Sequence, residues 1–343
     1  MTAAASVPFG LMDQGWADQA TPDADAVKGS LANIRLADEL GFDSSWIGEH
    51  HHIKPDAAFY GRVPASEVFL AYAAAQTQRI RLGTGVRILS TTPASRTAEE
   101  MSLLSLLSGD RVEFGIGLGS GQHGLKSREE KAALFRQLLS ELIAVLGDDP
   151  ATGLPPLSPR PPRDLVSRLW AAARDEPTID FLAEMGINLV AGQAELSQVQ
   201  AKYVQRYRQS GGRGRARGVR LVFVGETRAD ALRQSAAAAD LYFRQMTGGG
   251  YHKEAVEKGY LPADVKSRED QLLHISYVVG DPEEVAAALN THIAMTGIDQ
   301  LDAMVQIPRL NAEDVHRSMR LLQTEVRPRL VFPATAEQVA AAE

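Results

Sequence analysis

Residues 33–51 read NIRLADELGFDSSWIGEHH, and this stretch decides how the rest of the chain is interpreted. Apolar residues at helical spacing predict a helix from Asp25 to Leu40, and Gly41 supplies the stop signal. The short run Ser44–Gly48 that follows predicts a buried strand. Glu49 and His50 come directly after it. One helix and one strand therefore lead straight to a cluster of ionisable side chains.

The same alternation of short apolar runs and amphipathic stretches continues along most of the chain, which predicts parallel strands covered by helices. The predicted strands are Pro8–Met12, Ser44–Gly48, Ile80–Leu89, Val112–Ile116, Leu169–Ala173, Ile187–Ala191, Val219–Val224 and Asp302–Ile307. The clearest further helices are Ser66–Thr77, Ala98–Leu107, Glu129–Leu146 and Pro282–Met295. Such a series closes naturally into an α/β fold of the (β/α)₈ TIM-barrel type. An open doubly wound sheet gives a similar string, and periodicity alone leaves that alternative open.

Three segments interrupt this rhythm. Residues 147–163 contain six prolines and predict an irregular excursion. Residues 193–218, which end in the basic run GGRGRARG, and residues 245–271, which open with QMTGGGYHK, are predicted loop insertions. Long insertions after barrel strands cover the reactive C-terminal face, so the second is a candidate lid over the substrate. We predict a single domain over residues 1–332 and a flexible, alanine-rich tail over residues 333–343.

The composition limits the function classes. The 343 residues include 36 basic and 43 acidic side chains, and this net charge of −7 argues against binding nucleic acid or an anionic membrane. The chain has no cysteine, which excludes disulfides, thiolate nucleophiles and cysteine-ligated metals. The N-terminal residues MTAAASVPFG lack the basic and apolar regions of a signal peptide, and no apolar run approaches the ~18 residues of a membrane span. We therefore expect a cytoplasmic enzyme.

The run Glu49-His50-His51-His52 is the densest cluster of functional side chains, and it lies at the strand end where barrel enzymes place catalytic groups. Strand alternation would put His50 and His52 on one face and Glu49 and His51 on the other. Three interpretations compete. The histidines form hydrogen bonds at the barrel rim, or two of them share a metal, or one of them moves protons near neutral pH. No second histidine-rich strand end is present to complete a metal site.

Two glycine-rich runs are also candidates. Residues 115–121, GIGLGSG, resemble a dinucleotide fingerprint only weakly, because the next predicted helix begins later, near Glu129. A loop that lets the backbone approach a flat or phosphorylated cofactor is the other interpretation. In Arg81–Val86, RLGTGV, glycines inside a strand predict a bulge or a close backbone approach, and tight packing of a helix is equally compatible.

Together these segments resemble the bacterial-luciferase-like, flavin-dependent monooxygenase family. The matching pieces are LADELGFDSSWIGEHH (36–51), TQRIRLGTGVRIL (77–89), PASRTAEEMSLLSLLSGDRVEFGIG (93–117), GDPEEVAAAL (280–289) and GIDQLDAMVQIP (297–308). The resemblance covers about the first half and the last fifth of the chain and is thin between residues 192 and 273. The combination of GEHH after a strand with RLGTGV and P-x-x-R-x-A-E is specific, whereas each motif alone is not.

The resemblance implies a TIM barrel that binds reduced FMN, supplied by a separate flavin reductase, at the C-terminal strand ends. Oxygen adds to flavin C4a, and the resulting hydroperoxide oxygenates a small organic substrate. His50 matches the family's catalytic histidine and Glu49 the acidic residue beside the flavin ring. Gly85 and Val86 match a non-proline cis peptide under that ring. One branch of the family uses a reduced deazaflavin instead, and members are often homodimers, so both are expected by resemblance.

The sequence departs from the family at the predicted phosphate end of the flavin. Leu118 stands where the family often has a phosphate-binding arginine. Ser120 and Arg136 fall on two other phosphate-binding positions, and Arg174, Asp175 and Thr178 on the phosphate loop. We hypothesise that Arg174 and Arg136 together anchor the phosphate, since a guanidinium can bind it bidentately. A surface ion pair is the alternative for Arg174, and Asp175 is unfavourable beside a dianion.

Alternatives from other classes remain at this stage. A deazaflavin-dependent hydride-transfer enzyme on the same barrel would not use oxygen, and a non-catalytic flavin-binding protein would turn nothing over. A metal-dependent barrel hydrolase is a further alternative, although the prediction includes no metal site. The candidate apolar lining of the pocket is Phe9, Met12, Trp46 and Leu118. The loop Thr247–Tyr251 is expected to select the substrate, whose identity the sequence does not indicate.

Overall fold

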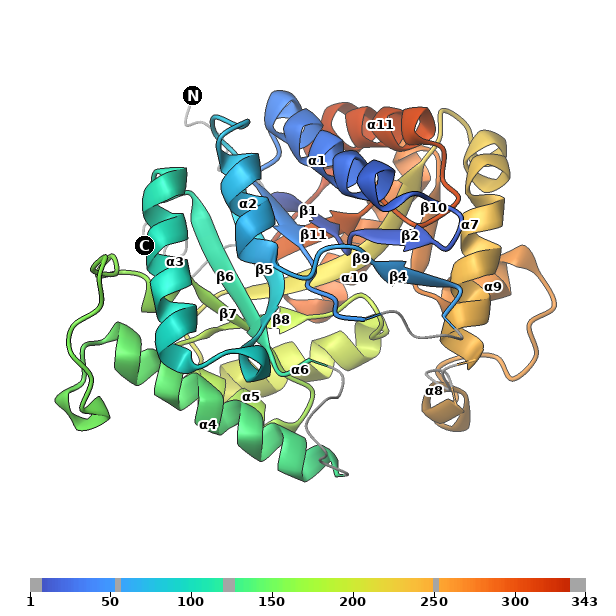
Figure 1. The fold of residues 1–343 in the computed structure, drawn as a ribbon. Helices are drawn as coiled ribbons and strands as arrows, with labels where there is room; N and C mark the ends of the chain where they lie inside the picture. The colour runs from blue at the N-terminus through green and yellow to red at the C-terminus, as the bar shows by residue number, and fades with distance from the viewer. Residues whose placement is uncertain (1–7, 53–56, 120–126, 249–252, 334–343) are drawn as a thin grey trace, which may run out of the picture.

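The computed structural model describes residues 8–52, 57–119, 127–248 and 253–333. Within these ranges, eight parallel strands form a closed barrel (Figure 1). They are β1 (Phe9–Asp13), β3 (Ser44–Ile47), β5 (Arg81–Ile88), β6 (Val112–Gly117), β7 (Leu169–Ala172), β8 (Asn188–Ala191), β9 (Ala216–Val224) and β11 (Gln300–Met304). Each pairs with the next, and β11 pairs with β1 from Phe9↔Leu301 to Met12↔Met304. The predicted (β/α)₈ barrel is therefore confirmed, and the open doubly wound sheet is wrong.

Helices cover the outside of the barrel. They are α1 (Asp23–Leu40), α2 (Ser66–Ala74), α3 (Ala94–Ser108), α4 (Arg128–Leu146), α5 (Glu176–Glu184), α6 (Ser197–Gln209), α7 (Arg228–Gly248), α8 (Lys253–Glu257), α9 (Arg268–His274), α10 (Pro282–Thr296) and α11 (Ala312–Leu321). Short helical turns lie at Leu89–Thr91, Pro150–Thr152, Val166–Arg168, Leu322–Val326 and Arg327–Arg329. No helix in the described part of the chain is long and apolar enough to cross a membrane.

Three small strands were not predicted. Strands β2 (Trp16–Asp18) and β4 (Phe59–Gly61) form an antiparallel pair beside the barrel mouth. Strand β10 (Tyr277–Gly280) pairs in parallel with the C-terminal half of β9, from Tyr277↔Leu221 onward. Strands β2 and β4 have three residues each, which is too few for a periodic pattern. The four-residue β10 is as long as β3, β7 and β8, which were predicted, so its length does not explain why it was missed.

The predicted insertions are more regular than expected. Residues 193–218 contain α6 and the start of β9, so the end of the basic run belongs to the barrel wall. The predicted lid, residues 245–271, begins inside α7, includes α8 and ends in α9, while residues 249–252 lie outside the described part. The predicted tail is likewise described only at residue 333.

The N-terminal end of the barrel interior is filled by a charged layer. Arg217 of β9 is 1% exposed, lies 2.9 Å from the Asp302 carboxylate of β11, and places its guanidinium carbon 3.4 Å from the centre of the Trp46 ring. Glu113 of β6 accepts from Arg81 at 2.7 Å and from Trp170 at 2.5 Å. Because these paired side chains fill this end, the opposite end of the barrel is the place for a ligand.

Candidate active site

Glu49, His50, Gln14 and Arg87 meet at the C-terminal rim of three neighbouring strands. Gln14 follows β1, Glu49 and His50 follow β3, and Arg87 lies near the end of β5. Strands β1, β3 and β5 are adjacent and parallel, so their C-terminal ends share one edge of the barrel. The sequence placed the acid and the histidine at this edge, and the structure adds their partners.

Glu49 is held by the protein rather than presented to a ligand. Its side chain is 0% exposed, and Oε1 lies 2.8 Å from both Arg87 Nη1 and His51 Nε2. Oε2 accepts from Ser66 Oγ at 3.3 Å and from the Ile88 N–H at 3.4 Å. A carboxylate with all its acceptor directions used in this way fixes the geometry of the rim.

Arg87 organises the same rim and was missed in the sequence. It is buried, and besides Glu49 it pairs with Glu67 at 3.5 Å and with Glu100 at 3.2 Å. Burial would lower the pKa of Arg87, but the three carboxylates outweigh it and raise the pKa. This cation therefore ties β3, α2, β5 and α3 together. The available signal in the sequence was an arginine, Arg87, directly after the RLGTGV motif.

His50 points toward the loop after β1. Its Nε2 lies 2.8 Å from the amide oxygen of Gln14, and its backbone N–H donates to the Val63 carbonyl at 3.0 Å. An amide oxygen only accepts hydrogen bonds, so Nε2 is the protonated ring nitrogen. A Cβ on Gly61 would stand 2.1 Å from the His50 ring, and one on Gly48 would stand 2.2 Å from the Gln14 amide oxygen. Both glycines therefore make room for the His50–Gln14 pair.

The predicted alternation of the histidines is only partly correct. Strand β3 ends at Ile47, so Glu49 to His52 do not continue a strand. Glu49 and His51 do lie together, as their hydrogen bond shows. His52 is exposed and has a positive φ of 58°. Among the residues that the structure describes, no three histidine or acidic side chains are grouped to hold a metal ion.

Strand β5 passes close to the barrel interior. The Gly85–Val86 peptide bond is cis, and the β5–β6 register shifts between Thr84 and Arg87, where a bulge or a close backbone approach was predicted. A Cβ on Gly83 would stand 2.0 Å from the Trp46 ring, and one on Gly85 would stand 2.9 Å from the end of Met12. Glycine at both positions thus admits these two apolar side chains to the interior.

The predicted apolar lining is half correct. Met12 and Trp46 belong to the inner cluster of the barrel. Phe9 points outward instead, where its ring packs 5.6 Å from that of Phe42. Leu118 follows the last residue of β6 and packs against the outer core, and its carbonyl accepts from Ser90 at 3.0 Å. Both therefore belong to the layer between strands and helices.

The residues predicted for the flavin phosphate fall into one group of three, Arg136, Asp175 and Thr178, and a separate ion pair of Arg174 with Glu195. Arg136 of α4 donates to Thr178 Oγ1 at 2.9 Å and lies 3.5 Å from Asp175, and Thr178 also donates to Asp175 at 2.8 Å. Arg174 places Nε 2.5 Å from Glu195, as in the ion-pair alternative. Ser120 lies outside the described residues.

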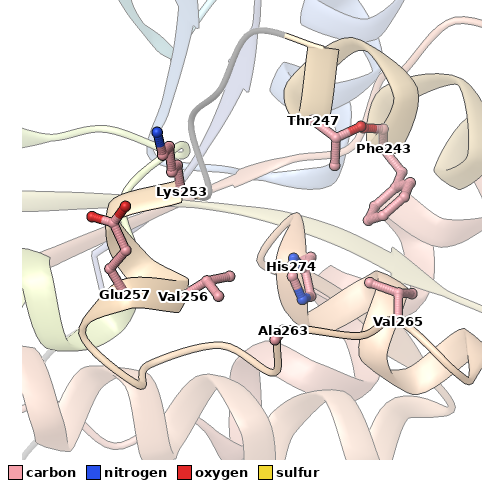
Figure 2. A pocket seen from close by; sticks show the side chains of 8 residues that line it. All are labelled: Phe243, Thr247, Lys253, Val256, Glu257, Ala263, Val265 and His274. Atoms are coloured by element: carbon pink, nitrogen blue, oxygen red, sulfur yellow. The ribbon is translucent and has the colours of Figure 1, made fainter.

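A cavity of about 460 Å³ lies within the predicted lid, between α7, α8 and α9 (Figure 2). Its lining is Phe243, Thr247, Lys253, Val256, Glu257, Ala263, Val265 and His274. None of the rim residues described above contributes to it. Of the described residues of the predicted substrate-selecting loop, 247 and 248, Thr247 lines this cavity.

The C-terminal part of α7 packs against β4, which belongs to the β2–β4 pair beside His50. Tyr242 of α7 stacks on Phe59 with ring centres 6.0 Å apart, and Phe59 contacts Trp16 at 4.9 Å. The Ala58 N–H donates to Gln245 at 3.0 Å. The β2–β4 pair is thus packed between α7 and the His50 loop.

A (β/α)₈ barrel with an acid–histidine cluster at its C-terminal rim defines the general class, a barrel enzyme. The family model of the luciferase-like monooxygenases matches residues 8–300, which is most of the chain. The chain therefore belongs to the luciferase-like monooxygenase family and is an oxidoreductase of that family. The family predicted from the sequence is confirmed.

The curated relatives include enzymes with specific names. N-acetyl-S-alkylcysteine monooxygenase of Bacillus subtilis (strain 168) is 28% identical over 192 residues, which cover 54% of this chain and 56% of the relative. The match thus spans about half of that relative's length. Limonene 1,2-monooxygenase of Rhodococcus erythropolis is 38% identical over 114 residues, or 33% of this chain and 28% of the relative.

Solved structures match over nearly the whole chain. Apo-MsnO8 is 27% identical with a TM-score of 0.72 and coverage of 94% of this chain and 98% of that one. The oxygenating constituent of 3,6-diketocamphane monooxygenase from Pseudomonas putida, in complex with FMN, is 17% identical with a TM-score of 0.76 and coverage of 96% and 100%. A secondary alcohol dehydrogenase with a bound deazaflavin adduct is 14% identical with a TM-score of 0.69 and coverage of 95% and 99%. The last two similarities show the fold alone.

Proposed function

We propose that this protein is a flavin-dependent monooxygenase that receives reduced flavin from a separate reductase and oxygenates a small organic substrate with O₂. The observation that carries the proposal is the His50–Gln14 pair, which holds a proton at the barrel mouth. It stands on the rim shared with the cis Gly85–Val86 backbone and above the apolar interior formed by Met12 and Trp46. Membership of the luciferase-like monooxygenase family supports the same reaction class.

The ring end of this site fits a flavin. Glycine backbone on β5 and the apolar Met12 and Trp46 suit a flat, largely apolar ring, and His50 adds one proton-bearing group. Reduced flavin, when bound, supplies the electrons that activate O₂. His50 in its imidazolium form would give the proton on Nδ1, because the Nε2 proton is held by the Gln14 amide oxygen, which would fix the orientation of the ring. Glu49 and Arg87 are positioning residues, because their charged groups bind each other.

FMN is the flavin that the family resemblance predicts, and a structural neighbour is described in complex with FMN. A deazaflavin-dependent hydride transfer is the second candidate, because two further neighbours of the same fold are named as deazaflavin-dependent enzymes. Oxygen consumption distinguishes the two, since hydride transfer between a deazaflavin and a substrate needs no O₂.

We also propose that the protein is a homodimer through an apolar face on α2 and α3. This α2–α3 face consists of Val68, Tyr72, Leu103 and Leu107, which are 49% to 68% exposed. The two helices pack beside each other on the outside of the barrel (Figure 1). Each pair is spaced i, i+4, so each helix carries two neighbouring apolar side chains on one face, and exposed apolar faces of this kind mark protein contacts.

The test of the function is an anaerobic titration with reduced FMN, followed by admission of O₂ in a stopped-flow spectrometer. We expect saturable binding and a transient absorbance that belongs to neither reduced nor oxidised flavin. His50→Ala should bind reduced flavin within about threefold of the wild type while product formation falls by at least ~10²-fold. His52→Ala, which changes the exposed neighbour, is the matched control and should keep wild-type turnover.

The proposal fails if the wild type binds no reduced flavin, or if it binds flavin but turns over no candidate substrate. Equal product formation by the wild type and His50→Ala would refute the role of His50 alone. Turnover that depends on a deazaflavin and consumes no O₂ would establish the second candidate in its place.

A further inference from the structure

The turn between β7 and α5 holds a carboxylate of the protein where the family resemblance predicts the flavin phosphate. Asp175 caps α5, and its Oδ1 accepts from the Thr178 N–H at 2.9 Å and from the Thr178 hydroxyl at 2.8 Å. The same oxygen lies 3.5 Å from Arg136 Nη1. A helix-start N–H, a hydroxyl and a guanidinium are the donors that a phosphate uses at such a turn. We call Asp175, Thr178 and Arg136 the anion seat.

The first turn of α5 offers few further donors. Pro177 has no N–H, and the Ile179 N–H donates to the Asp175 carbonyl at 3.0 Å. The Thr178 N–H is used by the Asp175 carboxylate. Within the described first turn, the N–H of Glu176 is therefore the one left to a ligand. A helix start binds a phosphate through several converging N–H groups, and this one has lost that capacity.

The charges around the seat also balance without a ligand. Arg136 faces Asp175 at 3.5 Å, and Arg174 faces Glu195 at 2.5 Å. Leu118 supplies no charge at the position where the family often has an arginine. Two guanidiniums thus meet two carboxylates in the described part of this turn. A phosphate near neutral pH would add about two negative charges to a neutral site and displace existing pairs.

The residues at this turn therefore do not fit a phosphate, whereas the residues at the barrel rim fit the flavin ring. We propose that this protein accepts riboflavin, whose ribityl chain ends in a neutral hydroxyl, at least as readily as FMN, because Asp175 already occupies the anion seat. This inference rests on the proposed function, since it concerns the same flavin site. It is the alternative to the hypothesis that Arg174 and Arg136 anchor a phosphate.

The experiment is calorimetric titration of the protein with reduced riboflavin and with reduced FMN under anaerobic conditions. For the wild type, we expect the Kd for FMN to be no lower than the Kd for riboflavin. Asp175→Ser keeps a side chain that can cap α5 and removes the negative charge. This variant should bind FMN at least tenfold more tightly than the wild type and riboflavin within twofold.

The matched control is Asp281→Ser, which removes the carboxylate that caps α10 through the N–H groups of Glu283 and Glu284. Both flavins should bind this variant within twofold of the wild type. Glu195→Gln is a second variant that frees Arg174 from its ion pair, and it should also tighten FMN binding selectively. It keeps the inference testable if Asp175→Ser does not fold.

Two results overturn the inference while leaving the proposed function standing. One is a wild type that binds FMN at least tenfold more tightly than riboflavin. The other is an unchanged ratio of the two Kd values in the folded variants. Failure of the wild type to bind either flavin would instead overturn the proposed function and the inference with it.

Discussion

Replacing His292 by asparagine should make the free energy of unfolding less sensitive to acid. His292 of α10 is 4% exposed and lies between the barrel wall and the helix layer. Its Nδ1 lies 3.2 Å from Arg220 Nε and 3.0 Å from Ser197 Oγ. Since a guanidinium N–H only donates, Nδ1 accepts and the neutral ring carries its proton on Nε2. Burial first, and then the Arg220 charge, lower the pKa of His292 to about 2.

The size of the effect follows from this shift. Below the ordinary pKa of 6.5, the unfolded chain binds a proton at His292 that the folded protein does not bind. The stability contributed by the neutral histidine is therefore fully present at pH 8 and is lost as the pH falls below 6.5. The loss is about 1.4 kcal/mol per pH unit, or about 2.7 kcal/mol between pH 8 and pH 4.5.

The assay is urea unfolding at pH 8, 6.5, 5.5 and 4.5, followed by the fluorescence of the buried Trp46 and Trp170. Asparagine keeps an acceptor near the position of Nδ1 but does not titrate, so His292→Asn should lose about 2.7 kcal/mol less than the wild type over this range. Any packing defect lowers the variant's stability equally at every pH, and the value at pH 8 measures it. Identical pH dependence in both proteins would refute the reasoning.

Three further predictions concern other parts of the molecule. Gly61→Ala places a Cβ 2.1 Å from the His50 ring, so turnover should fall at least ~10²-fold while the affinity for flavin stays within about threefold of the wild type. Turnover at the wild-type rate would contradict this geometry. The Asp38 carboxylate accepts from the three N–H groups of residues 78–80, so Asp38→Asn should lower the free energy of unfolding by about 2 kcal/mol in urea at pH 7. A change within error of zero would contradict this role. Leu107→Glu on the α2–α3 face should convert a dimer to a monomer in light scattering, and a monomeric wild type would refute the proposed dimer.

Acid lowers the contribution of both Asp38 and His292 to the free energy of unfolding, but for different reasons. The folded protein keeps His292 neutral, whereas it keeps Asp38 charged. Burial would raise the pKa of Asp38, but the N–H groups of Gln78, Ile80 and Arg79 outweigh it and lower the pKa. The stability that this carboxylate contributes is therefore present above its ordinary pKa of 3.8 and is lost as the pH falls through the lower folded value. Acid unfolding of Asp38→Asn should lack this component below pH 4, the range that the His292 measurement leaves out.

The barrel was predictable because most of its wall strands carry their own local signal. Strand Val112–Gly117 and residues 169–171 are buried on both sides, and burial on both faces appears in the sequence as a short apolar run. The start of β9 was missed because it lies in the basic run before Val219. Arg217 in this run is buried in the barrel interior, where its charge is balanced by Asp302. Because its partner Asp302 lies 85 residues further along the chain, no pattern in the sequence around Arg217 indicates that it is buried.

The sequence by itself determined the repeating architecture, the family, and the position of Glu49 and His50 at a strand end. These depend on short-range order along the chain, such as the helix stop at Gly41 and the strand that follows it. Only the tertiary structure decided what those side chains contact. Arg87 reaches Glu49 across 38 residues, and Gln14 reaches His50 across 36, because the barrel brings strand ends together. Asp175 was recognised from the sequence as unfavourable to a phosphate, but its use of the Thr178 and Arg136 donors depends on how α4 packs beside the β7–α5 turn.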